Sequence, residues 1–233
     1  MNFCRYLWIF LLIINYSIYS QSIDSNFTLV IDPGHGGKDP GNTGNGYLEK
    51  KIALSIGLKI GERLKKYKNI SVVYTRKTDV FVDLYRRAKI ANDVQADLFI
   101  SIHCDAHTSN AYGAGTFVLG LHANERNFKI AQKENSVIFL EDDYQQKYEG
   151  FDPNNPESVI SLVLMQEDYL DKSIVAANFI QKSFVNRLKR RDRTVKQAGF
   201  LVLRNTFMPS VLVETGFLTN KSEGSYLNSN KGQ

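Results

Sequence analysis

Cysteine is scarce in this chain of 233 residues, which contains only Cys4 and Cys104. If the segment that carries Cys4 is removed on export, Cys104 has no partner within the chain, so an internal disulfide is excluded. Cys104 directly follows His103, and neighbouring side chains on a strand point to opposite faces. We therefore expect Cys104 to be a small buried apolar residue rather than a metal ligand.

Long apolar runs are missing too, except for one near the start of the chain. This run begins at Tyr6, just after Arg5, and fades by Tyr19, so it is shorter than the roughly 20 apolar residues that span a membrane. One cation, a short apolar stretch and small residues after it are typical of a secretory signal. We predict a signal peptide over residues 1–22, with an uncleaved anchor as the alternative. The mature protein is then exported to the periplasm or cell envelope and has no stable membrane span.

The sequence also lacks a strong charge excess, internal repeats and low-complexity linkers. The net charge is only +5, and no ladder of aromatic and basic residues indicates a nucleic-acid surface. Basic residues gather in the segment 182–193, which is consistent with the favoured placement of cations at a helix end; attraction to anionic envelope polymers is the alternative. We expect one domain over residues 27–233, acting as a monomer.

Apolar stretches alternate with helical patterns along this domain. Apolar runs that end in polar or glycine-rich breaks predict strands at 29–31, 70–75, 98–103, 113–119, 199–203 and 211–214. Apolar residues at helical spacing predict helices at 49–64, 83–92, 124–137, 157–165 and 171–190. This alternation predicts a single α/β domain with a mostly parallel, twisted sheet of about six strands and helices on both faces.

Residues with metal-binding or acid–base chemistry lie at the ends of these elements. His35 and His103 each follow an apolar strand, Glu214 ends another, and Glu49 lies in the first turn of the first helix. Histidine nitrogens and carboxylate oxygens at converging strand ends are what a catalytic zinc site requires. Each residue also has a simpler interpretation: a loop or core histidine, a glutamate that caps its helix, or a carboxylate that binds the metal rather than moving protons.

Four short motifs occur in a fixed order. They are Asp-Pro-Gly-His-Gly-Gly-Lys-Asp-Pro-Gly at 32–41, Glu-Lys at 49–50, Ser-Ile-His at 101–103 and Val-Glu-Thr-Gly-Phe at 213–217. Together they resemble the zinc-dependent N-acetylmuramoyl-L-alanine amidases, of the type that separates daughter cells after division. The resemblance covers roughly residues 27 to 227.

The resemblance implies the roles of the four residues. One zinc ion per chain is held by His35, Glu49 and His103, and Glu214 is the catalytic carboxylate. The reaction is hydrolysis of the amide bond between N-acetylmuramic acid and L-alanine in peptidoglycan, for cell-wall remodelling. Asp105 is our candidate for a carboxylate that orients a ligand histidine, because it lies two residues after His103 on the strand. The alternatives are a zinc peptidase or carboxypeptidase acting on wall peptides, and a non-catalytic wall-binding module.

The segment 121–168 interrupts the alternation of strands and helices. It is long, polar and acidic where connections are usually short. The resemblance suggests a regulatory helix over the zinc site, which we expect within 137–149, with Glu141 as first candidate for a blocking carboxylate and Glu134 and Glu149 behind it. An activator protein would bind this insert. The alternative is a surface segment that only shapes the substrate groove. The resemblance also implies a last helix after the Glu214 strand, which we expect to be truncated here.

Overall fold

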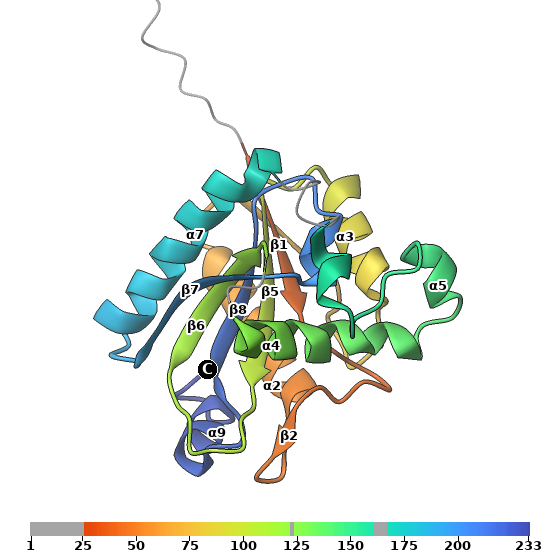
Figure 1. Ribbon diagram of the computed structural model, residues 1–233. Coiled ribbons are helices and arrows are strands. Elements are labelled where there is room, and N and C mark those ends of the chain that lie inside the picture. Colours follow the sequence, from red (N-terminus) through yellow and green to blue (C-terminus); the bar gives the residue numbers. More distant parts are fainter. Residues whose placement is uncertain (1–25, 122–123, 161–166) are drawn as a thin grey trace, which may run out of the picture.

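A computed structural model describes residues 26–121, 124–160 and 167–233, so the predicted signal peptide lies outside the described residues (Figure 1). Six strands form one sheet in the order β4-β1-β5-β8-β6-β7. Their bounds, in that order, are Ile70–Tyr74, Phe27–Pro33, Leu98–Asp105, Ser210–Phe217, Ala114–Leu119 and Asp192–Ala198. All neighbouring pairs are parallel except β6 and β8, which run antiparallel. The predicted mostly parallel sheet of about six strands is confirmed.

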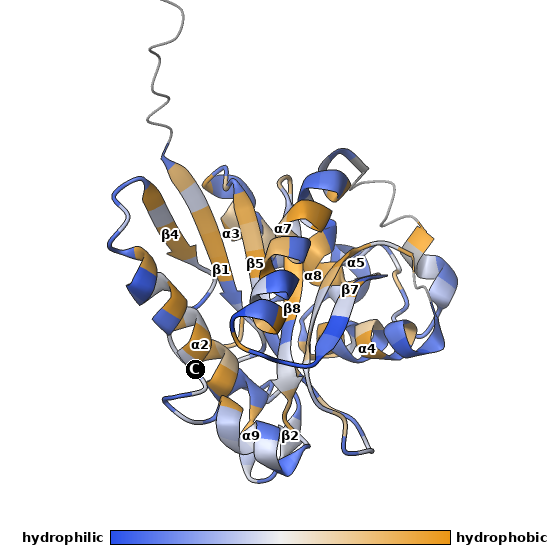
Figure 2. Ribbon diagram, turned by 90° about the vertical axis from the view of Figure 1, so that its left-hand side faces the viewer, coloured by the Kyte–Doolittle hydropathy of each residue, from blue (hydrophilic) through white to orange (hydrophobic). Residues whose placement is uncertain are grey.

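Side chains of alternate residues divide each central strand between two apolar layers. Helix α2 (Glu49–Leu64) packs on one face against residues such as Ile31 and Ile102. Helix α7 (Glu167–Asn186) packs beside it on Val211 and Val213. Figure 2 views the molecule from this side, with apolar residues coloured along both helices and the strands. Burial on both faces explains why the central strands are continuous apolar runs.

The other face of the sheet carries the remaining helices. Here α3 (Leu84–Asp93), α4 (Glu125–Asn135) and the short helix α8 (Leu201–Arg204) cover an apolar cluster that includes Phe99, Phe117 and Leu212 (Figure 1). Because side chains along a strand alternate with a period of two, His103 lies on the same face as Phe99, and Glu214 on the same face as Leu212. The chemical residues of the central strands therefore face the layer that contains α4.

The insert forms several short helices rather than one long one. After α4 come the 3₁₀ helix η1 (Ser136–Leu140), α5 (Tyr144–Lys147) and the 3₁₀ helix η2 (Pro156–Val159). The predicted helix at 157–165 falls largely outside the described residues. The small hairpin of β2 (Thr43–Gly44) and β3 (Tyr47–Leu48) precedes α2, and α9 (Lys221–Leu227) follows β8.

The strand predicted at 199–203 was wrong. That apolar segment contains a turn and α8, whose residues Leu201 and Leu203 are buried in the layer beneath the insert. The sixth strand is the preceding polar segment, β7. A short apolar run does not by itself distinguish a strand from a buried helix, and an edge strand need not be apolar. Within the described residues, no helix is long and apolar enough to cross a membrane.

Candidate metal centre and active site

His35 lies in a tight loop after β1 and faces the histidine of β5. Its own backbone is in the left-handed region, with φ of 60°. The two imidazole rings are 4.8 Å apart between centroids. This approach needs glycine at two positions: a Cβ on Gly34 would lie 2.5 Å from the ring of His103, and one on Gly41 would lie 2.5 Å from the ring of His35. The glycines of the first motif thus create the space for a histidine pair.

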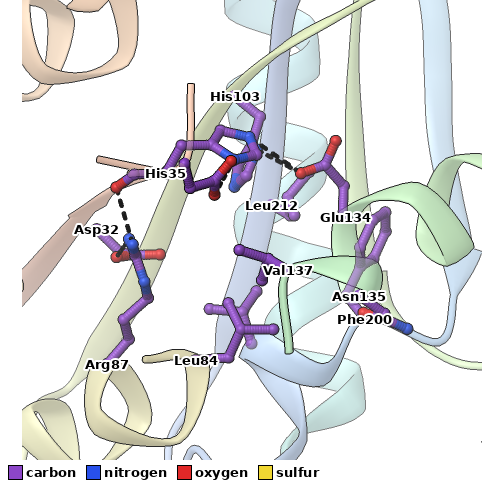
Figure 3. A pocket seen from close by; sticks show the side chains of 13 residues that line it. Asp32, His35, Leu84, Arg87, His103, Glu134, Asn135, Val137, Phe200 and Leu212 are labelled. Carbon is purple, nitrogen blue, oxygen red and sulfur yellow. Dashed lines mark hydrogen bonds and ion pairs between the residues drawn. The ribbon is translucent and has the colours of Figure 1, made fainter. Parts of the chain in front are cut away.

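Two buried arginines hold the His35 loop in place. Arg87 donates to Asp32 at 2.7 Å and to the carbonyl oxygens of Pro33 and His35 at 2.9 Å (Figure 3). Arg76 donates to the carbonyl of Pro33 at 2.9 Å and is only 3 % exposed, so it is not the surface residue that its polar neighbourhood suggests. Burial acts to raise the pKa of Asp32, but the charge of Arg87 lowers it below its usual value. A buried, paired network of this kind fixes the loop geometry.

Glu49 begins α2 and points between the two histidines. Its Oε2 accepts a hydrogen bond from the backbone N–H of Asn42, and its Oε1 accepts one from Cys104, both at 2.7 Å. The same oxygens lie 3.1 Å from His35 Nε2 and from His103 Nδ1. Burial acts to raise the pKa of Glu49, while both histidines lower it, and the net pKa lies well below its usual range. Glu49 is therefore an ionised carboxylate held by the backbone at the centre of the site.

The carboxylate that orients His35 is Asp39, which sequence reasoning missed. Asp39 Oδ2 lies 2.7 Å from Nδ1 of His35, so the other ring nitrogen points into the site. Asp105 does not take the expected position: its Oδ1 accepts a hydrogen bond from the N–H of Ala106. Its side chain lines a cavity together with Glu214, just after a shift in the pairing of β5 and β8. The spacing of histidine and aspartate within one loop was the available signal for Asp39.

The insert contributes a fourth side chain, Glu134, near the end of α4. Its Oε2 lies 3.2 Å from His35 Nε2 and 3.1 Å from His103 Nδ1 (Figure 3). The first candidate, Glu141, lies elsewhere: it accepts hydrogen bonds from the N–H of Leu84 and the hydroxyl of Tyr148. The third candidate, Glu149, pairs at 3.2 Å with Arg204. The structure thus brings Glu134 to the site, and it does so from α4 rather than from the expected range 137–149.

The position of Glu134 follows from the burial pattern of α4. The buried residues of this helix recur at helical spacing: Asn127, Ala131, Glu134 and Asn135. Asn135, the next residue, donates to the carbonyl of Gly199 and accepts from the N–H of Leu201, both buried contacts. The helix end is therefore anchored to the core beside the site. A glutamate in register with Ala131 was the signal that could have ranked Glu134 above Glu141.

His35, Glu49, His103 and Glu134 each offer one ligand atom, and these atoms all lie within 4.8 Å of one another. Among the described residues, His35 Nε2 and Glu134 Oε2 are buried without a hydrogen-bond partner. Burial acts to lower the pKa of His103, but Glu134 and Glu49 raise it to about 9. Imidazole nitrogens and carboxylate oxygens at such spacing suit a zinc ion.

Glu214 lies beside this group, on β8, where it is the register partner of His103 on β5. It is 3 % exposed, and both its oxygens lack a hydrogen-bond partner in the described part of the chain. Burial, followed by the charges of Asp105, Glu49 and Glu134, raises its pKa well above the usual value. An unpaired buried carboxylate is costly, and it is the kind of group that accepts and releases protons in catalysis.

Three further residues have side chains that could bind a metal: Cys104, His107 and His122. Cys104 is fully buried and packs with Ile52 and Leu218, as predicted. His107 is exposed, contacts Ser109 through its Nδ1 at 2.7 Å and lines the cavity that reaches Glu134. His122 lies outside the described residues.

Comparison with known proteins identifies the family. The sequence profile described as N-acetylmuramoyl-L-alanine amidase matches residues 29–233. The amidase AmiA of Salmonella typhimurium is 36 % identical over 208 residues, which cover 88 % of this chain and 70 % of that protein. The chain belongs to the N-acetylmuramoyl-L-alanine amidase family. A second relative, YqiI of Bacillus subtilis, is 32 % identical over 206 residues, 88 % of this chain and 77 % of that protein.

Solved structures of this amidase family share the fold. The N-acetylmuramoyl-L-alanine amidase of Clostridium difficile 630 matches with a TM-score of 0.62 and 30 % identity, over 89 % of both chains. The catalytic domain of CwlV from Bacillus (Paenibacillus) polymyxa matches with a TM-score of 0.58 and 27 % identity, over 88 % of this chain and 89 % of that one. The sheet that carries the histidines and Glu214 is therefore the amidase catalytic fold.

Proposed function

We propose that this protein is a zinc-dependent hydrolase that cleaves the amide bond between N-acetylmuramic acid and L-alanine in peptidoglycan. The observation that carries the proposal is the convergence of His35, Glu49 and His103 beside Glu214, a buried carboxylate with two unpaired oxygens. Membership of the amidase family supports the identity of the bond. The site thus has a ligand set for one zinc ion and a separate acid–base group.

His35, Glu49 and His103 would hold the zinc ion, because they come from the fixed body of the domain and converge on one point. When bound, zinc supplies Lewis-acid chemistry, polarising a carbonyl group and lowering the pKa of water to about 7. Asp39 holds His35 in the orientation that presents Nε2. The backbone N–H groups that bond Glu49 hold its carboxylate in a fixed orientation.

Glu214 would act as the general base and then the general acid. Its raised pKa favours the uptake of a proton from the attacking water, and the same proton can pass to the nitrogen of L-alanine as the bond breaks. The products are a glycan strand with a free lactyl carboxylate and a peptide stem with a free L-alanine amino group.

Glu134 would keep the resting enzyme slow. Its carboxylate occupies the side of the histidine pair that water and substrate need, and it comes from the insert rather than the fixed body. The insert is tied down along its length: Lys38 donates to the carbonyl of Leu140, and Lys133 donates to Asn42. An activator that binds the insert and withdraws α4 would shift the population toward an open site. The simpler possibility, that α4 only shapes the groove, is an outcome of the test given at the end of the Discussion.

The cellular role follows from this chemistry and from the predicted signal peptide. We place the protein in the periplasm or cell envelope, where removal of stems from glycan strands serves wall remodelling and daughter-cell separation. The CwlD amidase of Clostridioides difficile, which shares the fold, has been solved in complex with the GerS lipoprotein. For this chain the activator is a proposed partner of the insert.

The test is to incubate purified peptidoglycan with the protein and to identify the new chain ends. Amidase action releases L-alanine amino termini, whereas a wall peptidase or carboxypeptidase releases other ends and a binding module releases none. His35→Ala serves as the matched control, because it removes one ligand and should lose both zinc and hydrolysis. Full zinc content and full activity in His35→Ala would contradict the ligand assignment.

A further inference from the structure

A lysine lies next to Glu214 on the same face of the sheet. Gly115 on β6 is the register partner of Glu214 on β8, and the two strands run antiparallel. Side chains of directly opposite residues share a face, with Cβ atoms about 4.5–5.5 Å apart. A Cβ on Gly115 would lie 3.3 Å from Nζ of Lys196, so the lysine ammonium occupies the position a side chain would fill there. Lys196 is therefore a neighbour of the catalytic carboxylate.

The ammonium of Lys196 is half-buried and has few hydrogen-bond acceptors around it within the described residues. It lies over the buried ring of Phe117, 5.0 Å from the centroid, and donates to the carbonyl oxygen of Arg193. Burial, followed by the charges of Arg126 and Arg193, lowers its pKa to about 8. An ammonium has three N–H donors, and within the described residues this one makes that single hydrogen bond. Lys196 is thus a partly buried cation with N–H groups that can still donate hydrogen bonds to a ligand.

A cavity of 210 Å³ opens in front of this lysine. Three cations line it together with Glu214: Arg126, Arg193 and Lys196. The other acids of its lining are Asp105, which accepts from the N–H of Ala106, and Asp192, which accepts from Gln181 at 2.6 Å. A second cavity of 420 Å³, which reaches Glu134, shares Asp105, Arg126 and Ile130 with the first, so the two are adjacent along α4. The cavity in front of Lys196 is therefore adjacent to the one that reaches Glu134.

We propose that Lys196, assisted by Arg193, binds a free carboxylate of the stem peptide on the leaving-group side of the bond. This inference rests on the proposed function. Glu214 would protonate the L-alanine nitrogen, so the departing peptide lies on the side of Glu214 and meets its neighbour Lys196. In a stem whose second residue is γ-linked D-glutamate, the α-carboxylate of that residue is free. Two extended residues span at most about 7 Å, which places this carboxylate within reach of a group adjacent to Glu214.

The experiment uses two muropeptides that differ only in this group, which is a free carboxylate in one and an amide in the other. Rates are compared for the full chain and for its Glu134→Ala form, each with and without Lys196→Met. With Lys196 intact, we expect both forms to cleave the muropeptide with the free carboxylate with a kcat/KM about tenfold higher or more. This is the size of effect that a charged hydrogen bond produces. The forms with Lys196 intact are called the parent below. Lys196→Met should slow the carboxylate substrate alone and so remove the preference. Lys196→Arg should retain it, and Lys182→Met, an equal charge change at an exposed position of α7, should alter nothing.

Three results would overturn the proposal: no preference in the parent, an equal loss on both substrates in Lys196→Met, or no loss on either. Cleavage of neither substrate by a zinc-loaded parent would instead contradict the proposed function itself. A second measurement needs no variant. The dipeptide L-alanyl-γ-D-glutamate should inhibit the parent more strongly than the same dipeptide with its α-carboxyl amidated, and equal inhibition would also overturn the proposal.

Discussion

Two glutamates reach the same pair of histidines from opposite parts of the molecule. Glu49 lies in the first turn of α2, where a negative charge is favoured by the helix dipole, and two backbone N–H groups bond its oxygens. Glu134 lies one residue from the end of α4, where the dipole disfavours a negative charge, by typically about 0.3–1 kcal/mol. Its Oε2 has the imidazoles as neighbours but no hydrogen-bond donor among the described residues.

These different surroundings divide the site into a part that stays in place, which contains Glu49, and a part that the insert can remove, which contains Glu134. Glu49, the His35 loop and the arginines behind that loop form a buried network that is complete without the insert. For Glu134, burial acts to raise the pKa, but the charges of the two histidines lower it to about 2. We propose that Glu134 leaves the histidines when a partner holds α4 away from the site, while Glu49 stays in place.

The largest effect that separates the two sides is expected for Glu49→Gln. The neutral amide is a poor zinc ligand and leaves the backbone N–H groups with a weaker acceptor. Changes in groups that merely support a ligand cost about 10–100-fold in metal affinity, so loss of the ligand charge should exceed that. Zinc content after dialysis and calorimetric titration of zinc would measure it. Unchanged zinc affinity would assign Glu49 to a helix-capping role and contradict the claim that Glu49 is a permanent zinc ligand.

The second largest effect is expected for Glu214→Gln. Unlike Glu49 and Glu134, the Glu214 carboxylate contacts neither histidine, so this change should affect the rate and not the metal. Gln keeps the size of the side chain but does not accept the proton, and general acid–base groups are worth about 10²–10⁴-fold in rate. We expect zinc content to remain stoichiometric while the release of L-alanine amino termini falls by that factor. Loss of zinc in this variant would instead make Glu214 a ligand and require the roles of Glu49 and Glu214 to be exchanged.

The smallest effect is expected for Glu141→Gln, which loosens the insert without touching the histidines. Glu141 bonds the N–H of Leu84, at the start of α3, and the hydroxyl of Tyr148. A charged hydrogen bond contributes about 1.5–3 kcal/mol, and Glu141 is buried. We expect a higher population of the open insert, seen as faster amide hydrogen exchange in α4 and a several-fold rise in wall hydrolysis. Faster exchange without a rise in activity would show that α4 does not limit the rate.

Sequence reasoning predicted the sheet and the four central residues because their signals are local. An apolar strand followed by His35, His103 or Glu214 is visible in a few residues, and parallel strands bring their ends to one edge of the sheet. Glu49 was placed in the first turn of α2 by helical spacing alone, which the structure confirms. The resemblance to the amidases added the chemical roles, which remain proposals.

The errors arose where the outcome depends on contacts between distant segments. Glu141 was ranked first because it lies in an acidic stretch, yet its position is set by packing against α3, far away in the sequence. Asp105 lies beside Glu214, whereas the carboxylate that bonds His35 is Asp39, from a different loop that no pattern within β5 reveals. The apolar segment 199–203 was taken for a strand because burial alone does not distinguish strand from helix.

The most direct test of the central claim compares Glu134→Ala with the unchanged protein on purified peptidoglycan, each carrying one zinc ion per chain. If His35, Glu49 and His103 suffice to hold the metal and Glu134 closes the site, the variant should keep its zinc. Without any partner, it should also release L-alanine amino termini about tenfold faster or more, since a tenfold change needs a shift of only about 1.4 kcal/mol between closed and open forms. A folded, zinc-loaded Glu134→Ala protein with an unchanged or lower rate would contradict the account.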